Sequence, residues 1–269
     1  MKFCKYQGAG NDFVIVDNMD LSIKEAIPEL AAAVCDRRFG VGADGFILAE
    51  PSDQADVKMN FYNADGSVAG MCGNGIRCFA KFITDHGITS GSPVSVETGD
   101  GIKHVEIIES AELITRVRVD MGSFSDMRNV SSCGFDVTAM HLGVPHAVIF
   151  ADTRGQGMEK LSAMAEEHGH DIEFADEFSP AHTNVNFIEI RGEDSILCST
   201  WERGAGKTLA CGTGACSSAV ASHLEKGLAD RIRVTMPGGE VIVSVKKEND
   251  TDIVYMEGSA VITFKGEYF

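Results

Sequence analysis

The stretch MCGNGIRC at residues 71–78 decides the fold, because the chain carries a second version of it, ACGTGAC, at residues 210–216. Each version opens an apolar, helix-forming segment that stops at a glycine, Gly87 in the first and Gly227 in the second. The pattern therefore predicts two helices, each entered through a glycine turn and each with a cysteine at its N-terminus.

The N-terminus of a helix favours anions, because its first N–H groups have no partner within the helix and the helix dipole is positive there. A free cysteine titrates near ~8.5, and a helix N-terminus lowers this value. The same N–H groups can hold a substrate carboxylate, since glycines allow close approach to the backbone. Paired in this context, Cys72 and Cys211 are candidates for reactive thiols, whereas the other six cysteines fit small buried hydrophobes.

The repeat extends beyond the cysteines, which are separated by 211 minus 72, or 139 residues. Ten residues before each cysteine, YNADG at residues 62–66 corresponds to WERGA at residues 201–205. With a few residues of slack, residues 10–17 also resemble residues 144–152. The chain is therefore predicted to contain two copies of one domain.

The first copy is expected to span residues 1–120, with the C-terminal strand 262–269 as a candidate to complete it, and the second to span 121–261. Strands alternating with one long helix per copy predict an α+β fold of two pseudo-symmetric domains. Each domain is expected to be a curved, mostly antiparallel sheet around a central helix, with the active site in the cleft between them. Two further helices are expected, near residues 22–38 and 160–167, with an acidic loop after the second.

The composition excludes several classes of function. A net charge of −17 and a pI near 4.8 oppose a nucleic-acid or anionic-membrane surface, so a small-molecule substrate is expected. The N-terminus lacks a signal-peptide pattern and no apolar run is long enough to span a membrane, which predicts a cytoplasmic protein. No C-x-x-C pair is present, and the cysteine spacings do not match a zinc site.

Six motifs resemble the diaminopimelate epimerase family, in the right order and over nearly the whole chain: residues 10–13, 63–67, 71–78, 145–148, 202–204 and 210–216. The resemblance implies a pyridoxal-independent epimerase that interconverts LL- and meso-diaminopimelate in lysine and peptidoglycan precursor synthesis. It implies an amino-acid substrate and no metal or organic cofactor, and a homodimer is a possible assembly.

The resemblance also assigns roles to individual residues. Cys72 and Cys211 would be the acid/base pair on opposite faces of the α-carbon, and His146 would support the site. The remaining residues would bind the substrate through its reacting carboxylate, its reacting ammonium group or its distal end: Gly73, Asn74, Gly212, Thr213, Glu202, Asn11, Asn63, Asn184 and Arg203.

Elementary chemistry agrees with this assignment. Inverting a stereocentre by proton transfer requires a base on one face and an acid on the other, and one residue per domain copy supplies both. One cysteine must be a thiolate while the other is a thiol, so the pair should titrate as a coupled unit.

One position departs from the family pattern. Where the family usually has Gly-Asn-Pro-His, this chain has Gly143-Val144-Pro145-His146, and Val144 cannot make the hydrogen bond expected of that asparagine. Either neighbouring groups or water compensate, or the distal specificity has changed. The alternatives are a related cofactor-independent racemase of another amino acid, such as histidine, and a non-catalytic amino-acid-binding or thiol-sensing protein.

Overall fold

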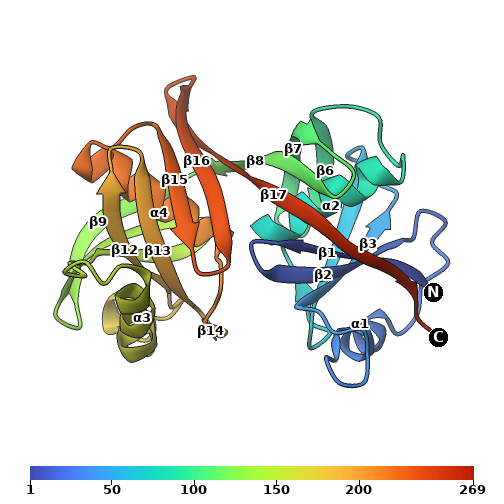
Figure 1. Cartoon of the computed structure of the whole chain (residues 1–269), viewed down its shortest axis with the longest axis horizontal. Coiled ribbons are helices and arrows are strands. Elements are labelled where there is room, and N and C mark those ends of the chain that lie inside the picture. Colours follow the sequence, from blue (N-terminus) through green and yellow to red (C-terminus); the bar gives the residue numbers. More distant parts are fainter. The chain divides into compact units, whose positions relative to one another are not determined.

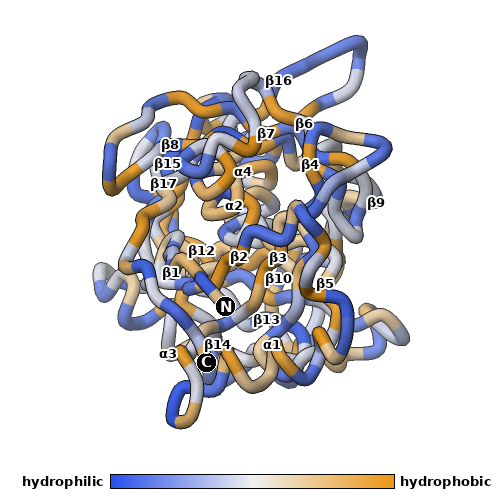
Figure 2. The backbone as a smooth tube through the Cα atoms, turned by 90° about the vertical axis from the view of Figure 1, so that its right-hand side faces the viewer, coloured by the Kyte–Doolittle hydropathy of each residue, from blue (hydrophilic) through white to orange (hydrophobic).

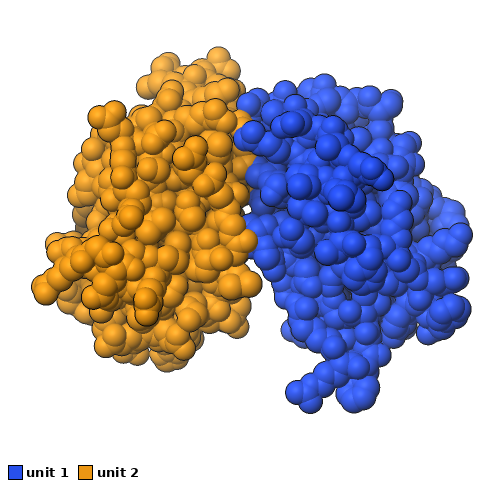
Figure 3. All heavy atoms as spheres, viewed as in Figure 1, with its two compact units in different colours: residues 1–119, 258–269 blue, residues 120–257 orange.

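The computed structural model describes residues 1–269 and divides into two compact units. Unit 1 comprises residues 1–119 and 258–269, and unit 2 comprises residues 120–257 (Figure 3). The chain passes from one unit to the other within two strands, β8 (Ile114–Ser123) and β17 (Thr251–Glu267). The end of the chain therefore belongs to the same unit as its beginning.

In unit 1, eight strands hydrogen-bond into a closed ring around one helix (Figure 1). The ring runs in the order β1 (Lys2–Gly8), β2 (Asn11–Asp17), β3 (Gly45–Glu50), β4 (Val57–Asn63), β6 (Val94–Thr98), β7 (Gly101–Ser110), β8 and β17. Most neighbours are antiparallel, and the exceptions are β2–β3 and β4–β6. A two-residue strand, β5 (Val68–Ala69), pairs with β4.

Unit 2 repeats this arrangement. The strands pair in the order β9 (Ser125–Ser132), β10 (Phe135–Leu142), β11 (Val144–Phe150), β12 (Asn184–Gly192), β13 (Ser195–Glu202), β15 (Arg231–Met236) and β16 (Gly239–Glu248). The parallel pairs, β11–β12 and β13–β15, match those of unit 1, and the short strand β14 (Gly206–Lys207) pairs with β13 as β5 pairs with β4.

The strand register gives the correspondence between the units residue by residue. Tyr62 pairs with Val68, and 139 residues later Trp201 pairs with Lys207. Phe13 lies opposite Gly45 in one parallel pair and His146 opposite Asn184 in the other. Counting from these pairs, Asn11 corresponds to Val144, Asn63 to Glu202 and Asp44 to Thr183.

Each unit is built around the helix that follows its cysteine, α2 (Gly73–Asp85) in unit 1 and α4 (Gly212–Lys226) in unit 2. Residues 73–83 are all buried, as expected for a helix surrounded by its own sheet. Figure 2 shows apolar residues along both helices and polar residues at the hairpin tips. The helix α4 ends at Gly227, which has a left-handed conformation (φ 70°) that caps the last carbonyls. Both predicted helices and the predicted fold class are confirmed.

The two outer helices differ from their predicted bounds. The predicted helix 22–38 is only α1 (Ile27–Cys35), because Pro28 is tolerated in the first turn alone and the chain turns sharply at Ala26 (φ 52°). The predicted helix 160–167 is α3 (Met158–Glu173), which takes in the start of the predicted acidic loop. A short 3-10 helix, η1 (Asp176–Phe178), follows it. The buried Leu161, Ala165 and Ile172 of α3 pack on the sheet of unit 2.

Candidate active site

In unit 1, Cys72 is the N-cap residue of α2. Its backbone is extended (φ −126°, ψ 124°), and its carbonyl oxygen accepts the N–H of Ile76 at 2.8 Å. The first N–H groups of the helix, those of Gly73 and Asn74, have no acceptor within the helix. The Sγ atom of the half-buried Cys72 lies 3.6 Å from Oδ1 of Asn11, which places the thiol beside an amide oxygen.

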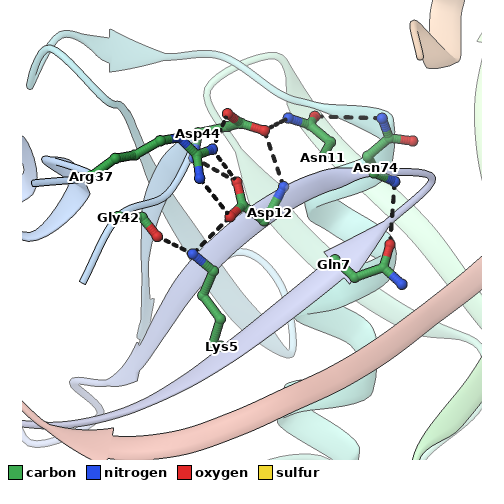
Figure 4. Close-up of polar contacts among 9 residues, drawn as sticks. Lys5, Gln7, Asn11, Asp12, Arg37, Gly42, Asp44 and Asn74 are labelled. Carbon is green, nitrogen blue, oxygen red and sulfur yellow. Dashed lines mark hydrogen bonds and ion pairs between the residues drawn. The ribbon is translucent and has the colours of Figure 1, made fainter. Parts of the chain in front are cut away.

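The amide of Asn11 is oriented by its neighbours (Figure 4). Its Nδ2 donates to Oδ2 of Asp44 at 2.5 Å, so its Oδ1 faces Cys72 and also accepts from Nδ2 of Asn74 at 3.4 Å. A carboxylate can only accept hydrogen bonds, so Asp44 determines which way this amide points. The buried Arg77 donates to Oδ1 of Asn74 at 2.8 Å and orients that amide in turn.

An ionic cluster supports this network from behind (Figure 4). Asp12 accepts from Arg37 at 2.7 Å and pairs with Lys5 at 2.8 Å, and Arg37 also reaches Asp44 at 2.7 Å. Burial would raise the pKa of Asp12, but the hydrogen bonds from Arg37 and Lys5 outweigh it and lower the pKa to about 2. Asp12 is therefore ionised at neutral pH, and its ion pairs hold the start of β2, where Asn11 lies, in place.

In unit 2, Cys211 is the N-cap residue of α4 and is 4 % exposed. Its Sγ accepts the N–H of Gly214 at 3.4 Å and lies 3.5 Å from the hydroxyl oxygen of Thr213. Burial raises the pKa of the Cys211 thiol well above its usual value, and the negative charge of the adjacent Glu202 raises it further. Cys211 is therefore a neutral thiol beside Glu202.

Glu202 is the last residue of β13, and Arg203 begins the turn that follows it. Burial raises the pKa of Glu202, whose Oε1 accepts the hydroxyl of Thr208 at 2.6 Å. The backbone N–H of Arg203 donates to Oδ1 of the buried Asn184 at 2.7 Å, and its guanidinium donates to the carbonyl of Ala181 at 2.7 Å. Arg203 and Asn184 are thus brought together, and Glu202, the residue before Arg203, lies beside Cys211.

His146 is 1 % exposed and lies on β11. Burial lowers the pKa of its imidazole to about 3, with smaller effects from the charges of His141 and Arg203, so the ring is neutral. Its Nδ1 lies 3.2 Å from Nδ2 of Asn186, which assigns the ring proton to Nε2. That atom is buried and has no hydrogen-bond partner in the structure.

The sequence model of one family spans most of the chain: the family described as diaminopimelate epimerase matches residues 3–126 and 138–263. The chain belongs to the diaminopimelate epimerase family. The resemblance drawn from its motifs is thereby confirmed, and family membership makes the chain an isomerase.

Relatives named diaminopimelate epimerase match along nearly their whole length. The protein from Carboxydothermus hydrogenoformans is 40 % identical over 290 residues, which cover 100 % of both chains. That from Desulfitobacterium hafniense is 39 % identical over 286 residues, covering 99 % of this chain and 97 % of the relative.

Solved structures share the fold at low sequence identity. A PhzF-family phenazine biosynthesis protein from Bacillus anthracis has a TM-score of 0.75 at 16 % identity and covers 100 % of this chain and 99 % of its own. A probable proline racemase from Agrobacterium radiobacter K84 has a TM-score of 0.69 at 15 % identity, covering 100 % and 92 %. These likenesses concern the fold alone.

Two positions that the family motifs single out lie away from these contacts. Asn63 is exposed at the end of β4, and its amide donates to the hydroxyl of Ser67 at 3.0 Å rather than to Cys72. Val144, in place of the family asparagine, is half-buried at the start of β11 and pairs with Leu142. It is the counterpart of Asn11 in the repeat, so unit 2 lacks the amide that contacts the cysteine in unit 1.

The sequence analysis missed the residues that hydrogen-bond to the predicted site residues and orient them. Asp44 and Thr208 each contact a predicted site residue, and Glu173 accepts hydrogen bonds from the turn that carries Glu202. The repeat gives no signal for Asp44 or Thr208, because their counterparts, Thr183 and Ala69, carry different side chains. No cluster of three or more His, Cys, Asp or Glu side chains is arranged to hold a metal, and none of the helices is long and apolar enough to cross a membrane.

Proposed function

We propose that this chain interconverts LL- and meso-diaminopimelate without pyridoxal phosphate, as a step in lysine and peptidoglycan precursor synthesis. One observation carries the proposal: in a chain of this family, each of the two repeated units places a cysteine, Cys72 or Cys211, at the N-cap of its buried central helix. One substrate α-carbon would contact both sulfurs. A cytoplasmic location and a homodimer stay predictions.

The proposed reaction transfers one proton at each face of the α-carbon. In one direction the thiolate of Cys72 removes the α-proton, so that a C–H bond breaks and an S–H bond forms. The thiol of Cys211 then donates its proton to the opposite face. The raised pKa of Cys211 supports this starting state, because it keeps that residue protonated before substrate binds. The return reaction exchanges the two roles.

The carbanion formed in between needs preorganised donors. The unpaired N–H groups at the two helix N-termini, at Gly73-Asn74 and at Gly212-Thr213, would hold the reacting carboxylate as negative charge develops on it. Glu202 would hold the reacting ammonium group. These groups supply the stabilisation from the chain itself, so no cofactor is part of the proposal.

The other substrate contacts come from both units. Asn11 and Asn63 of unit 1 and Asn184 and Arg203 of unit 2 would bind the substrate, several of them at its distal end. The neutral His146 would support the site through its one buried N–H group. At Val144, a neighbouring group or water would replace the hydrogen bond of the family asparagine.

The test is α-proton exchange in D2O, under reducing conditions and without pyridoxal phosphate, with LL-diaminopimelate and L-histidine offered to separate samples. We expect exchange with inversion on diaminopimelate alone. Cys72→Ala and Cys211→Ala should each reduce inversion by about 10²- to 10⁴-fold, the range for loss of a general acid or base. Exchange on histidine alone would transfer the function to a histidine racemase, and full activity in either alanine variant would exclude the two-base mechanism.

A further inference from the structure

The last turn of α3 carries a buried carboxylate that the proposed mechanism does not use. Glu173 is 3 % exposed, and both of its oxygens accept hydrogen bonds from one short segment of the chain. Its Oε2 accepts the indole N–H of Trp201 at 2.7 Å, and its Oε1 accepts the backbone N–H of Gly204 at 3.1 Å. These two bonds bracket Glu202 and Arg203.

The helix surface next to Glu173 is shaped for the same segment. Gly169 lies one turn earlier, so it shares a face of α3 with Glu173. A Cβ atom at Gly169 would lie 2.4 Å from Cγ of Trp201, a distance that real Cβ atoms do not adopt. Only glycine lets Trp201 lie directly on the helix, with its indole N–H at the carboxylate.

The segment is also held on its other side. The backbone N–H of Arg203 donates to Asn184, and the carboxylate of Glu202 accepts from Thr208. Packing alone does not need a charged group at Glu173, because burying a carboxylate is unfavourable unless its oxygens are hydrogen-bonded. A carboxylate is suited to this position because its two oxygens can accept from two N–H donors, one from Trp201 before the site residues and one from Gly204 after them.

We propose that Glu173 is a positioning residue: it holds the turn at residues 201–204 so that Glu202 stays against Cys211 and Arg203 stays oriented toward substrate. The inference rests on the roles proposed above for Glu202 and Arg203. It adds the outer helix α3 to the parts of the chain that determine activity.

Glu173→Gln tests the proposal with almost no change in size. Glutamine keeps one acceptor and turns the other into a donor, which then faces an N–H donor of Trp201 or Gly204. We expect kcat/KM for LL-diaminopimelate to fall about 10- to 100-fold, the size of effect that a misplaced site group produces. The KM should rise more than kcat falls, because substrate contacts are displaced while both cysteines remain.

The chain supplies its own spectroscopic reporter, because Trp201 is its single tryptophan. Loss of the hydrogen bond to Glu173 should shift or quench the Trp201 emission of the folded Glu173→Gln variant. The matched control is Glu166→Gln, an exposed glutamate of the same helix that pairs with Lys207 at 2.7 Å. This control should keep both the emission and the kinetic constants of the parent chain.

A second variant distinguishes the effect of opposing donors from a general loss of stability caused by Glu173→Gln. In Glu173→Gln/Trp201→Phe the indole donor is gone, so the glutamine can turn its oxygen to Gly204 without opposing donors. The double variant should therefore recover kcat/KM by three- to tenfold over Glu173→Gln. A double variant no more active than Glu173→Gln would overturn the proposal.

Two further outcomes would overturn it in distinguishable ways. A shifted Trp201 emission with unchanged kcat and KM would mean that the turn is released but that Glu202 and Arg203 do not bind substrate, which contradicts the proposed function of the site. Unchanged emission together with unchanged kinetics would mean that Glu173 does not hold the turn, and would leave the proposed function intact.

Discussion

In unit 1 the Sγ atom of Cys72 lies 3.6 Å from the neutral amide oxygen of Asn11, whereas in unit 2 Cys211 lies against the carboxylate of Glu202. The backbone at the two cysteines is nearly the same, with an extended N-cap residue before a buried helix in both cases. The counterpart of Glu202 in unit 1 is the exposed amide of Asn63. The repeat thus preserves the helix N-terminus and changes the charge beside it, which makes the two thiols chemically different.

Glu202→Gln should have the largest effect on this difference between the two cysteines. The negative charge of Glu202 raises the pKa of Cys211, so removing it should lower that pKa and let Cys211 ionise at lower pH than in the parent chain. We expect kcat/KM to fall about 100-fold, because a charge-assisted contact to the ammonium group is lost. The pH midpoint of Cys211 alkylation by iodoacetamide, followed by peptide mass spectrometry, measures the titration directly.

The matched control is Asn63→Asp, which places a carboxylate at the corresponding position of unit 1. It should leave the alkylation midpoint of Cys211 unchanged, because Asn63 is not among its hydrogen-bonding neighbours. An unchanged midpoint in Glu202→Gln as well would show that burial alone keeps Cys211 protonated. The electrostatic contrast between the units would then disappear.

A smaller effect concerns the ionic cluster that unit 1 has and unit 2 lacks, since the counterpart of Asp12 is Pro145. The pKa of Asp12 is about 2 in the folded chain and 3.8 as its ordinary value. A carboxylate with a depressed folded pKa stabilises the fold above the ordinary pKa, and this stabilisation is lost as pH falls through about 2. At full value this shift corresponds to somewhat more than 2 kcal/mol, and solvent screening of the partly exposed Asp12 side chain reduces its contribution to about 1–2 kcal/mol.

Asp12→Asn should therefore lower the free energy of unfolding by about 1–2 kcal/mol at pH 7, with a difference from the parent chain that narrows between about pH 4 and pH 2. Urea denaturation followed by far-UV circular dichroism measures it, because the single tryptophan lies in unit 2 and does not report on unit 1. Asp53→Asn, at an exposed residue of unit 1, is the control. A constant difference across this pH range would mean that Asp12 acts through shape and not through charge.

The sequence predicted the parts of this comparison that local patterns encode. The Cys-Gly-x-Gly motifs located both central helices, because a glycine turn followed by helix formers is a local signal. The outer helices were placed less well: one was predicted too long across Pro28, and α3 was predicted to stop before the acidic residues. Polar side chains on the last turn of a helix are hard to tell from a loop when their partners are distant in sequence.

For the site, too, local patterns predicted some residues and not others. Cys72 and Cys211 followed from the repeat, whereas the supporting residue Glu173 did not, because its partner Trp201 lies 28 residues away and the contact needs the full length of α3. The amide of Asn11 is oriented by Asp44, 33 residues away, for the same reason. Contacts of this kind depend on how strands and helices pack, so no local sequence pattern predicts them.

The smallest expected effect tests whether the asymmetry reaches the substrate. Val144→Asn gives unit 2 the amide that Asn11 supplies in unit 1. One net hydrogen bond contributes about 0.5–1.5 kcal/mol, so the KM for LL-diaminopimelate should fall about two- to tenfold. The kcat should stay the same, because the amide would contact the distal end of the substrate and not the reacting carbon.

Val144→Ala separates the new hydrogen bond from the loss of apolar bulk, because it removes the bulk without adding an amide. If the alanine variant lowers KM as much as the asparagine variant does, space and not hydrogen bonding limits binding at this position. If Val144→Asn raises KM while Val144→Ala leaves it unchanged, the chain binds its substrate through other groups. An apolar side chain at position 144 is then compatible with bound substrate, and a polar one is not. The fall in KM therefore has to be specific to the amide if position 144 lacks a hydrogen bond to the substrate.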